Sequence, residues 1–454
     1  MLPLVEIDSA NSARGNFNGN TPATPIGPFL FQGALYHVLY TYLSAPPFTT
    51  EILKSLDGGQ TWAVLDALNE PQTYGGAGYF DLANSRLVFF YADPVAFIFQ
   101  IQIFDLLTGT WGLAFAGGGV APANVQNVFG AYLRPDGTRA VLYQDSATGV
   151  ISCAVLNAAN AWVTSFPVNT NAPPGFTMDG FAVMDSTGRV HVVFAAQGFP
   201  QPQCYQAIEP NNALGQFNTL GPGFNSLYFG TPAVVGNSIV VPTIQGPFPG
   251  PPPSFNPVAG TVWIGTPLNA PVWAESDSIF PNADGQSLVQ NPLGTSAPVL
   301  FLDTTSQVLY ALAVLSNPVG GVFSYILQLS KTVSLGNPAI GWNDSTIYTT
   351  PATSTSPTYQ TLICLTLGGA KGRLYIAFDA NDAAGFAGNE VAFFFPFPPT
   401  AIVIGGSPGG GGAAYRPPTC ERCCPPLLAE LAPWKRHKRA LELDAPPPGS
   451  TGSG

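Results

Sequence analysis

Short runs rich in β-branched and aromatic residues recur along most of the chain, at intervals of 47 to 60 residues. Such residues favour strands, and similarity at a fixed interval indicates a repeat architecture. The central residues of these runs are Val38, Val88, Val141, Val192, Val240, Leu300 and Ile347. A second series, of aromatic residues, has a similar spacing: Trp62, Trp111, Trp162, Phe217, Trp273 and Phe323. Because the two series drift together, we expect a chain of similar β-units.

Turn signals place further strands inside each unit. Pro135-Asp136-Gly137 and the run from Asp185 to Gly188 are typical of hairpin turns between a first and a second strand. Each unit then holds four short strands, the pattern of a β-propeller blade. The seven runs predict an all-β fold, a β-propeller of seven four-stranded blades. The last unit lacks its aromatic residue and is followed by another run, Arg373–Phe378, so six blades with an elaborated closure are the alternative.

The composition agrees with many short strands joined by tight turns. The chain has 50 Gly and 46 Pro, and only 9% of its residues are charged. Gly and Pro interrupt regular structure, while a hydrophobic fraction of 46% is too high for a disordered chain. The chain has no apolar run of eighteen residues, so we expect no membrane span. The first residues lack the regions of a signal peptide.

One stretch carries a recognisable motif. Residues 55–62 read Ser-Leu-Asp-Gly-Gly-Gln-Thr-Trp. This stretch resembles the Asp-box (BNR) motif of sialidase-like β-propellers, and weaker echoes end at Trp111 and Trp162. The resemblance implies that the aspartate caps the turn between the third and fourth strands of a blade. It also implies that the tryptophan packs between blades and that the motif lies away from the ligand face. The expected structural residues are Ser55, Asp57, Gly59, Thr61 and Trp62.

Catalytic residues of that family are missing. Sialidases bind a substrate carboxylate with three arginines and carry an early Arg-Ile-Pro motif, which does not occur in this sequence. Arg86, Arg139 and Arg189 share one repeat position, at the start of the second strand. This regularity predicts a structural role, in which the aliphatic stems cover blade edges.

Other residues that could carry chemistry also favour structural roles. A glycoside hydrolase needs two carboxylates facing each other, but most aspartates stand in turns, where they cap backbone groups: Asp57, Asp136, Asp185 and Asp303. The two histidines of the body, His37 and His191, are expected between blades. Three cysteines in apolar strands are expected as buried thiols: Cys153, Cys204 and Cys364. We therefore predict no catalytic residue and no cofactor.

The chain changes character near residue 400. The predicted organisation is a propeller over 1–399, a Gly/Pro-rich linker over 400–416 and a flexible basic tail over 417–454. The tail has three cysteines: Cys420, Cys423 and Cys424. They could form a disulfide, contribute to a metal site with His437, or stay reduced. A second tail segment suits docking to an acidic protein surface: Trp434, Lys435, Arg436, Lys438 and Arg439.

Charge and missing motifs lead to two functional hypotheses. Residues 401–454 carry a net charge of +2, which leaves −13 on the first 400 residues, so nucleic acid is not expected at the propeller. The first hypothesis is a non-enzymatic display protein that its tail tethers to a larger assembly, such as a phage or virus particle, and whose loops bind glycan or protein. The alternative is a carbohydrate-active enzyme, a glycoside hydrolase or lyase of sialidase-like fold.

Overall fold

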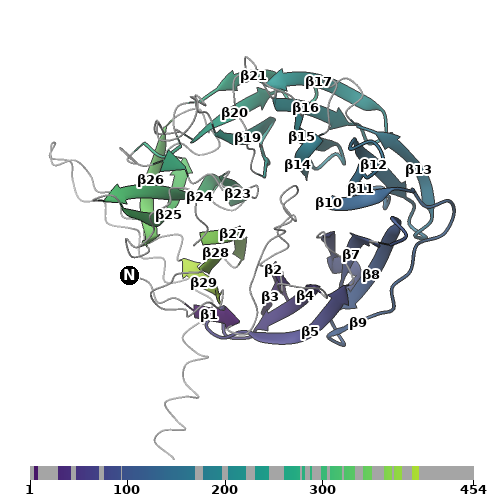
Figure 1. Cartoon of the computed structure of the whole chain (residues 1–454), viewed down its shortest axis with the longest axis horizontal. Helices are drawn as coiled ribbons and strands as arrows, with labels where there is room; N and C mark the ends of the chain where they lie inside the picture. The colour runs from purple at the N-terminus through teal and green to yellow at the C-terminus, as the bar shows by residue number, and fades with distance from the viewer. Residues whose placement is uncertain are drawn as a thin grey trace, which may run out of the picture. The chain divides into compact units, whose positions relative to one another are not determined.

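The computed structural model shows an all-β chain (Figure 1). Contacts divide the chain into two compact units, Met1–Ala401 and Ile402–Gly454. All described residues belong to the first unit. They are 5–8, 29–41, 48–70, 76–93, 95–168, 177–196, 203–220, 231–244, 260–276, 279–281, 287–288, 298–303, 307–319, 322–332, 341–349, 362–370, 373–380 and 391–397.

The first three sheets each take four consecutive antiparallel strands. The first holds β2 (Phe29–Phe31), β3 (Ala34–Thr41), β4 (Phe48–Ser55) and β5 (Ala63–Glu70). The second holds β6 (Ala77–Asp81), the 3-10 helix η1 (Leu82–Asn84), β7 (Arg86–Ala92), β8 (Phe99–Asp105) and β9 (Thr110–Trp111). The third holds β10 (Val125–Leu133), β11 (Arg139–Asp145), β12 (Ile151–Leu156) and β13 (Trp162–Pro167).

Three more sheets follow in chain order. The fourth holds β14 (Thr177–Met184), β15 (Val190–Ala196), β16 (Gln203–Ile208) and β17 (Leu214–Leu220). The fifth holds β18 (Ala233–Val235), β19 (Ser238–Ile244), β20 (Gly260–Thr266) and β21 (Val272–Glu275). The sixth holds β22 (Ser287–Leu288), β23 (Val299–Asp303), β24 (Val308–Val319), β25 (Val322–Thr332) and β26 (Trp342–Thr349), with both β22 and β23 paired to β24.

A closing sheet joins distant parts of the first unit. It pairs β1 (Val5–Asp8) with β29 (Val391–Phe397), followed by β28 (Arg373–Ala380) and β27 (Leu362–Ala370). Contacts between first strands connect each sheet to the next, from β6 through β10, β14, β18 and β23 to β27, and β27 contacts β2. The first sheet contacts the second through their outer strands, β5 and β9, and this completes the circle of contacts. The sheets therefore surround a common centre, as Figure 1 shows, and the expected all-β propeller of four-stranded antiparallel blades is confirmed.

The sequence-based count of seven units is not supported. The run centred on Ile347 does not open a seventh unit, because it belongs to β26, the outer strand of the sixth sheet. The run centred on Leu300 is β23, which takes the place of a first strand in its sheet, whereas the earlier runs are second strands. The β-branched pattern of a run identifies a strand but not its place within a sheet, and this explains the error.

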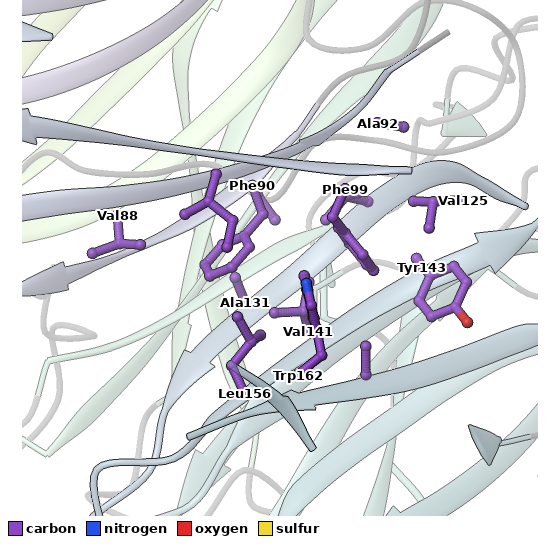
Figure 2. Packing of buried hydrophobic residues seen from close by; sticks show 14 of the residues in the cluster. Val88, Phe90, Ala92, Phe99, Val125, Ala131, Val141, Tyr143, Leu156 and Trp162 are labelled. Carbon is purple, nitrogen blue, oxygen red and sulfur yellow. The ribbon is translucent and has the colours of Figure 1, made fainter. Parts of the chain in front are cut away.

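Alternation along each strand builds the core between neighbouring sheets. In β7, Leu87, Phe89 and Tyr91 pack toward the first sheet, whereas the residues between them, including Val88 and Phe90, pack toward the third. Figure 2 shows this second cluster, in which side chains from β7 and β8 meet side chains from β10 to β13. Because both faces of a strand are buried, period-two alternation of apolar and polar residues is absent from β7.

Candidate functional site

Two faces of the ring carry different connections. Antiparallel strands place successive connections on alternate edges of a sheet. The turn that holds Asp57 joins β4 to β5, the third and fourth strands of the first sheet, and we call this side the Asp57 face. The β7–β8, β9–β10 and β11–β12 connections lie on the opposite face. The resemblance to Asp-box proteins predicts that a ligand would bind on that opposite face.

The Asp57 turn is held by its own side chains. Asp57 Oδ1 accepts hydrogen bonds from the N–H groups of Gln60 and Thr61, both at 2.9 Å. The Thr61 hydroxyl donates to Asp57 Oδ2 (2.7 Å), and the Ser55 hydroxyl donates to Asp57 Oδ1 (2.8 Å). Partial burial opposes ionisation of Asp57, but these hydrogen bonds outweigh it and lower its pKa to about 2. The Trp62 Nε1–H donates to the Gly59 carbonyl (3.2 Å), so the motif residues contact one another.

The arginines of the shared repeat position hold the Asp57 face together. Arg86 pairs with Asp81 at 2.9 Å. Arg139 is buried, and its Nε donates to the Tyr79 hydroxyl of the preceding sheet (2.8 Å). Arg189 forms two hydrogen bonds to Glu209 of its own sheet. All three guanidinium groups bind groups of the protein itself, as a structural role requires; that their stems cover blade edges stays a prediction.

The two histidines, His37 and His191, are both buried. His191 Nδ1 lies 2.8 Å from the Tyr205 hydroxyl, and its Nε2 lies 3.2 Å from Asp185 Oδ2. Tyr205 packs against Trp273 of the fifth sheet, with ring centroids 5.0 Å apart. Burial lowers the pKa of His37 to about 4. The carboxylate–imidazole–phenol chain at His191 could move a proton, but its inaccessibility to substrate makes it a structural network between sheets.

Aspartates cap turns, as expected for three of the four that the sequence singled out. Asp136 accepts the N–H of Thr138 (2.9 Å), and Asp185 accepts those of Thr187 (2.8 Å) and Arg189 (3.1 Å). The same arrangement recurs at Asp105, in the weaker Asp-box echo that ends at Trp111, and at two positions that sequence reasoning missed, Asp93 and Asp145. The signal that could have found them is an aspartate placed four residues before a glycine, as at Asp105–Gly109 and Asp145–Gly149.

The described part of the opposite face is formed by three connections. We define the three-loop surface as residues 95–98, 120–125 and 145–150. Backbone hydrogen bonds join the segments: the Val125 N–H donates to the Phe97 carbonyl (2.8 Å), and the Ser146 N–H donates to the Asn124 carbonyl (2.7 Å). The side chains of Phe97, Asn124 and Ser146 are exposed. An aromatic ring beside amide and hydroxyl groups is the mixture that binds small polar ligands.

The remaining predicted residues divide into two groups. Cys153 and Cys204 are buried free thiols, as expected, and burial raises both pKa values to about 12. The three tail cysteines and the tail docking residues lie outside the described residues. Among residues that the structure describes, no three His, Cys, Asp or Glu side chains gather as metal ligands. Within the same ranges, no helix has the length and apolar character of a membrane span.

Comparison with known proteins identifies the fold. No family model and no curated protein matches the sequence. A PL25 ulvan lyase solved with -[GlcA(1-4)Rha3S]- matches with a TM-score of 0.52 and 8% identity, over 87% of this chain and 96% of that chain. Polysaccharide lyase Uly1 matches with a TM-score of 0.52 and 10% identity, over 87% and 99%. BP39L lectin from Burkholderia pseudomallei matches with a TM-score of 0.52 and 11% identity, over 84% and 98%.

These matches correct the expectation of a non-enzymatic display protein. Two of the proteins that share the fold along nearly their whole length are polysaccharide lyases. The expectation was inferred from missing sialidase residues. That inference was wrong because a propeller places residues for different reactions on the same scaffold. Neither a virus particle nor a disulfide gains support from these matches.

Proposed function

We propose that this protein is a carbohydrate-active enzyme that binds and cleaves a polysaccharide at the face opposite Asp57. The observation that carries the proposal is the shared fold with two polysaccharide lyases, which extends over 87% of this chain and nearly all of theirs. The lectin match supports the carbohydrate part of the proposal. The mixed aromatic and polar character of the three-loop surface supports the choice of face.

The fold matches favour a lyase over a hydrolase, since two proteins that match with a TM-score of 0.52 are polysaccharide lyases. A hydrolase needs two carboxylates that are free to act as acid and base or nucleophile. On the three-loop side, Oδ1 of Asp93 and Oδ1 of Asp145 each accept two backbone N–H groups, so both aspartates support their own turns. A lyase needs no such pair: a base removes the C5 proton of a uronate, the C4–O bond breaks as the C4=C5 double bond forms, and the leaving glycosidic oxygen takes up a proton from an acid or from water. We therefore favour a uronate-containing polysaccharide as the substrate.

Chain-length analysis of a polysaccharide panel tests the proposal. The purified protein is incubated with ulvan, alginate, polygalacturonate and arabinan, and the products are separated by size-exclusion chromatography. The proposal predicts shorter chains from at least one uronate polymer and unchanged arabinan. Unchanged chain length for the whole panel would contradict it. Cleavage of arabinan alone would support a carbohydrate-active enzyme but contradict its assignment as a lyase.

We also propose that the closing sheet completes the ring as an elaborated closure. Support comes from its four antiparallel strands and from the contacts of its strand β27 with β23 and β2. In this arrangement the N-terminal strand β1 hydrogen-bonds to β29, near the end of the first unit. The two ends of the ring are then joined by a sheet rather than by packing alone.

A further inference from the structure

One turn design occurs three times in the second and third sheets. In each copy an aspartate side chain accepts the backbone N–H groups of the second and third residues after it. The N–H of the fourth residue after the aspartate donates to the aspartate carbonyl, at 2.7 to 2.8 Å. The copies are Asp93–Phe97, Asp105–Gly109 and Asp145–Gly149.

The closing position of this turn requires a left-handed backbone. Gly109 and Gly149 occupy it with φ of 74° and 71°, while Phe97 occupies it with φ of 52°. Glycine adopts this region without cost, whereas a bulky residue with a Cβ is strained there. Two hydrogen bonds hold the strained residue, from the Phe97 N–H to the Asp93 carbonyl and from the Val125 N–H to the Phe97 carbonyl, both 2.8 Å.

The Phe97 side chain remains only partly buried in this strained turn. Phe97 is 39% exposed, although Phe99, two residues further along, is completely buried in the core. The neighbouring Val95 is 86% exposed. A bulky residue in a strained backbone without a packing reason indicates a role for the ring at the surface.

The segments that are hydrogen-bonded to the Phe97 turn carry exposed polar residues. Asn124 precedes Val125, whose N–H holds the Phe97 carbonyl, and Ser146 donates its N–H to the Asn124 carbonyl (2.7 Å). Thr148 is exposed in the same turn as Ser146. Sugar rings present C–H groups on their faces and hydroxyls at their edges. A surface that exposes an aromatic ring together with an amide and two hydroxyls therefore suits one sugar unit.

We propose that Phe97 is a stacking platform for one sugar unit of the polysaccharide. This inference rests on the proposed function and deepens it by assigning a binding subsite to the three-loop surface. The turn fixes the ring before the ligand arrives, so binding requires little ordering of this side chain. The apolar face of the sugar lies on the ring, and its hydroxyls reach Asn124, Ser146 and Thr148.

Replacing Phe97 with asparagine separates binding from folding. Asparagine tolerates the left-handed region, and Asn124, Asn160 and Asn212 already adopt it in this chain, with φ of 60°, 60° and 69°. Phe97→Asn should therefore keep or raise the thermal midpoint while removing the ring. Phe97→Tyr keeps the stacking face. The matched control is Leu82→Asn, which removes a 58% exposed apolar side chain from the Asp57 face.

The assay is affinity electrophoresis of the full chain in gels that contain ulvan, alginate, polygalacturonate or arabinan. One of these polysaccharides should retard the wild type. We expect Phe97→Asn to lower the affinity for that polysaccharide by roughly tenfold, equivalent to about 1.4 kcal/mol. Phe97→Tyr and Leu82→Asn should bind it like the wild type. Wild-type-like binding by Phe97→Asn would overturn the subsite and leave the proposed function intact. If no polysaccharide retards the wild type, both proposals fail.

Discussion

At the scale of single residues, the sequence predicted how charged groups are used but not which surface residue is unusual. Asp57 was assigned a structural role from the Asp-box resemblance. The Arg86 series was assigned one from its shared position, because a repeated position favours a repeated contact. Phe97 was missed. Its signal is a phenylalanine at a position that is glycine in two similar aspartate turns. The sequence alone does not reveal this signal, because the three turns are recognised as similar only from their shared hydrogen bonds.

Replacing Asp57 with alanine should lower the free energy of unfolding by about 1–2 kcal/mol at neutral pH, because three hydrogen-bond donors of the turn lose a charged acceptor. The folded-state pKa of Asp57 lies below its unfolded value of 3.8, at about 2. The contribution is therefore complete above the unfolded pKa and is lost as pH falls toward 2. Urea denaturation of both proteins at several pH values measures this difference. A difference that stays constant down to pH 2 would contradict the assignment.

Replacing Tyr205 with phenylalanine removes the hydroxyl beside His191 Nδ1 and leaves a buried ring nitrogen without that partner. We expect the free energy of unfolding to fall by about 1–3 kcal/mol. Polysaccharide cleavage should be unchanged at temperatures where the variant is folded, since the pair is buried between sheets. Denaturation and activity are measured on the same preparation. A loss of activity without a loss of stability would give His191 a catalytic role.

At the scale of strands and sheets, sequence periodicity found strands more reliably than it found their positions. Val88 and Phe90 were read correctly as parts of a strand, and the structure shows that both faces of that strand are buried. The run around Ile347 was misplaced, since an outer strand and a second strand have the same β-branched composition. The partner of β1 could not be read from the repeat, because β29 follows it by several hundred residues.

Core and surface positions of the second sheet should respond very differently to truncation. Phe99 is completely buried and stacks on Trp162 with ring centroids 4.7 Å apart, so Phe99→Ala should cost about 3–5 kcal/mol. Leu113 is 93% exposed, and Leu113→Ala should change stability by less than about 0.5 kcal/mol. Chemical denaturation compares the two variants. Equal effects would contradict the packing between the second and third sheets.

Removing residues 1–8 tests the closing sheet. The deletion removes β1 and exposes the edge of β29, which pairs with β1 from Val5 to Asp8. If this sheet closes the ring, the thermal midpoint should fall by several degrees, and the whole first unit should unfold in one transition. A midpoint equal to that of the full chain would show that β1 adds nothing to the ring. Residues 1–4 alone, which precede β1, provide the control deletion.

At the scale of the whole molecule, the sequence predicted the fold better than it predicted the function. Repeats and turn residues predicted a propeller, because they determine strand length and connectivity. Function depends on a few side chains on one face, and missing sialidase residues such as Arg-Ile-Pro excluded one reaction without identifying another. The proposal of a carbohydrate substrate rests instead on the fold shared with polysaccharide lyases and on the exposed Phe97.

The most direct test of polysaccharide cleavage is the ultraviolet absorbance of a uronate polymer during incubation with the purified protein. Elimination creates a C4=C5 double bond at each new chain end, and this bond absorbs where the intact polymer does not. We predict that absorbance rises with time and with protein concentration for at least one of ulvan, alginate and polygalacturonate. Flat absorbance together with unchanged chain length for all three would contradict the account.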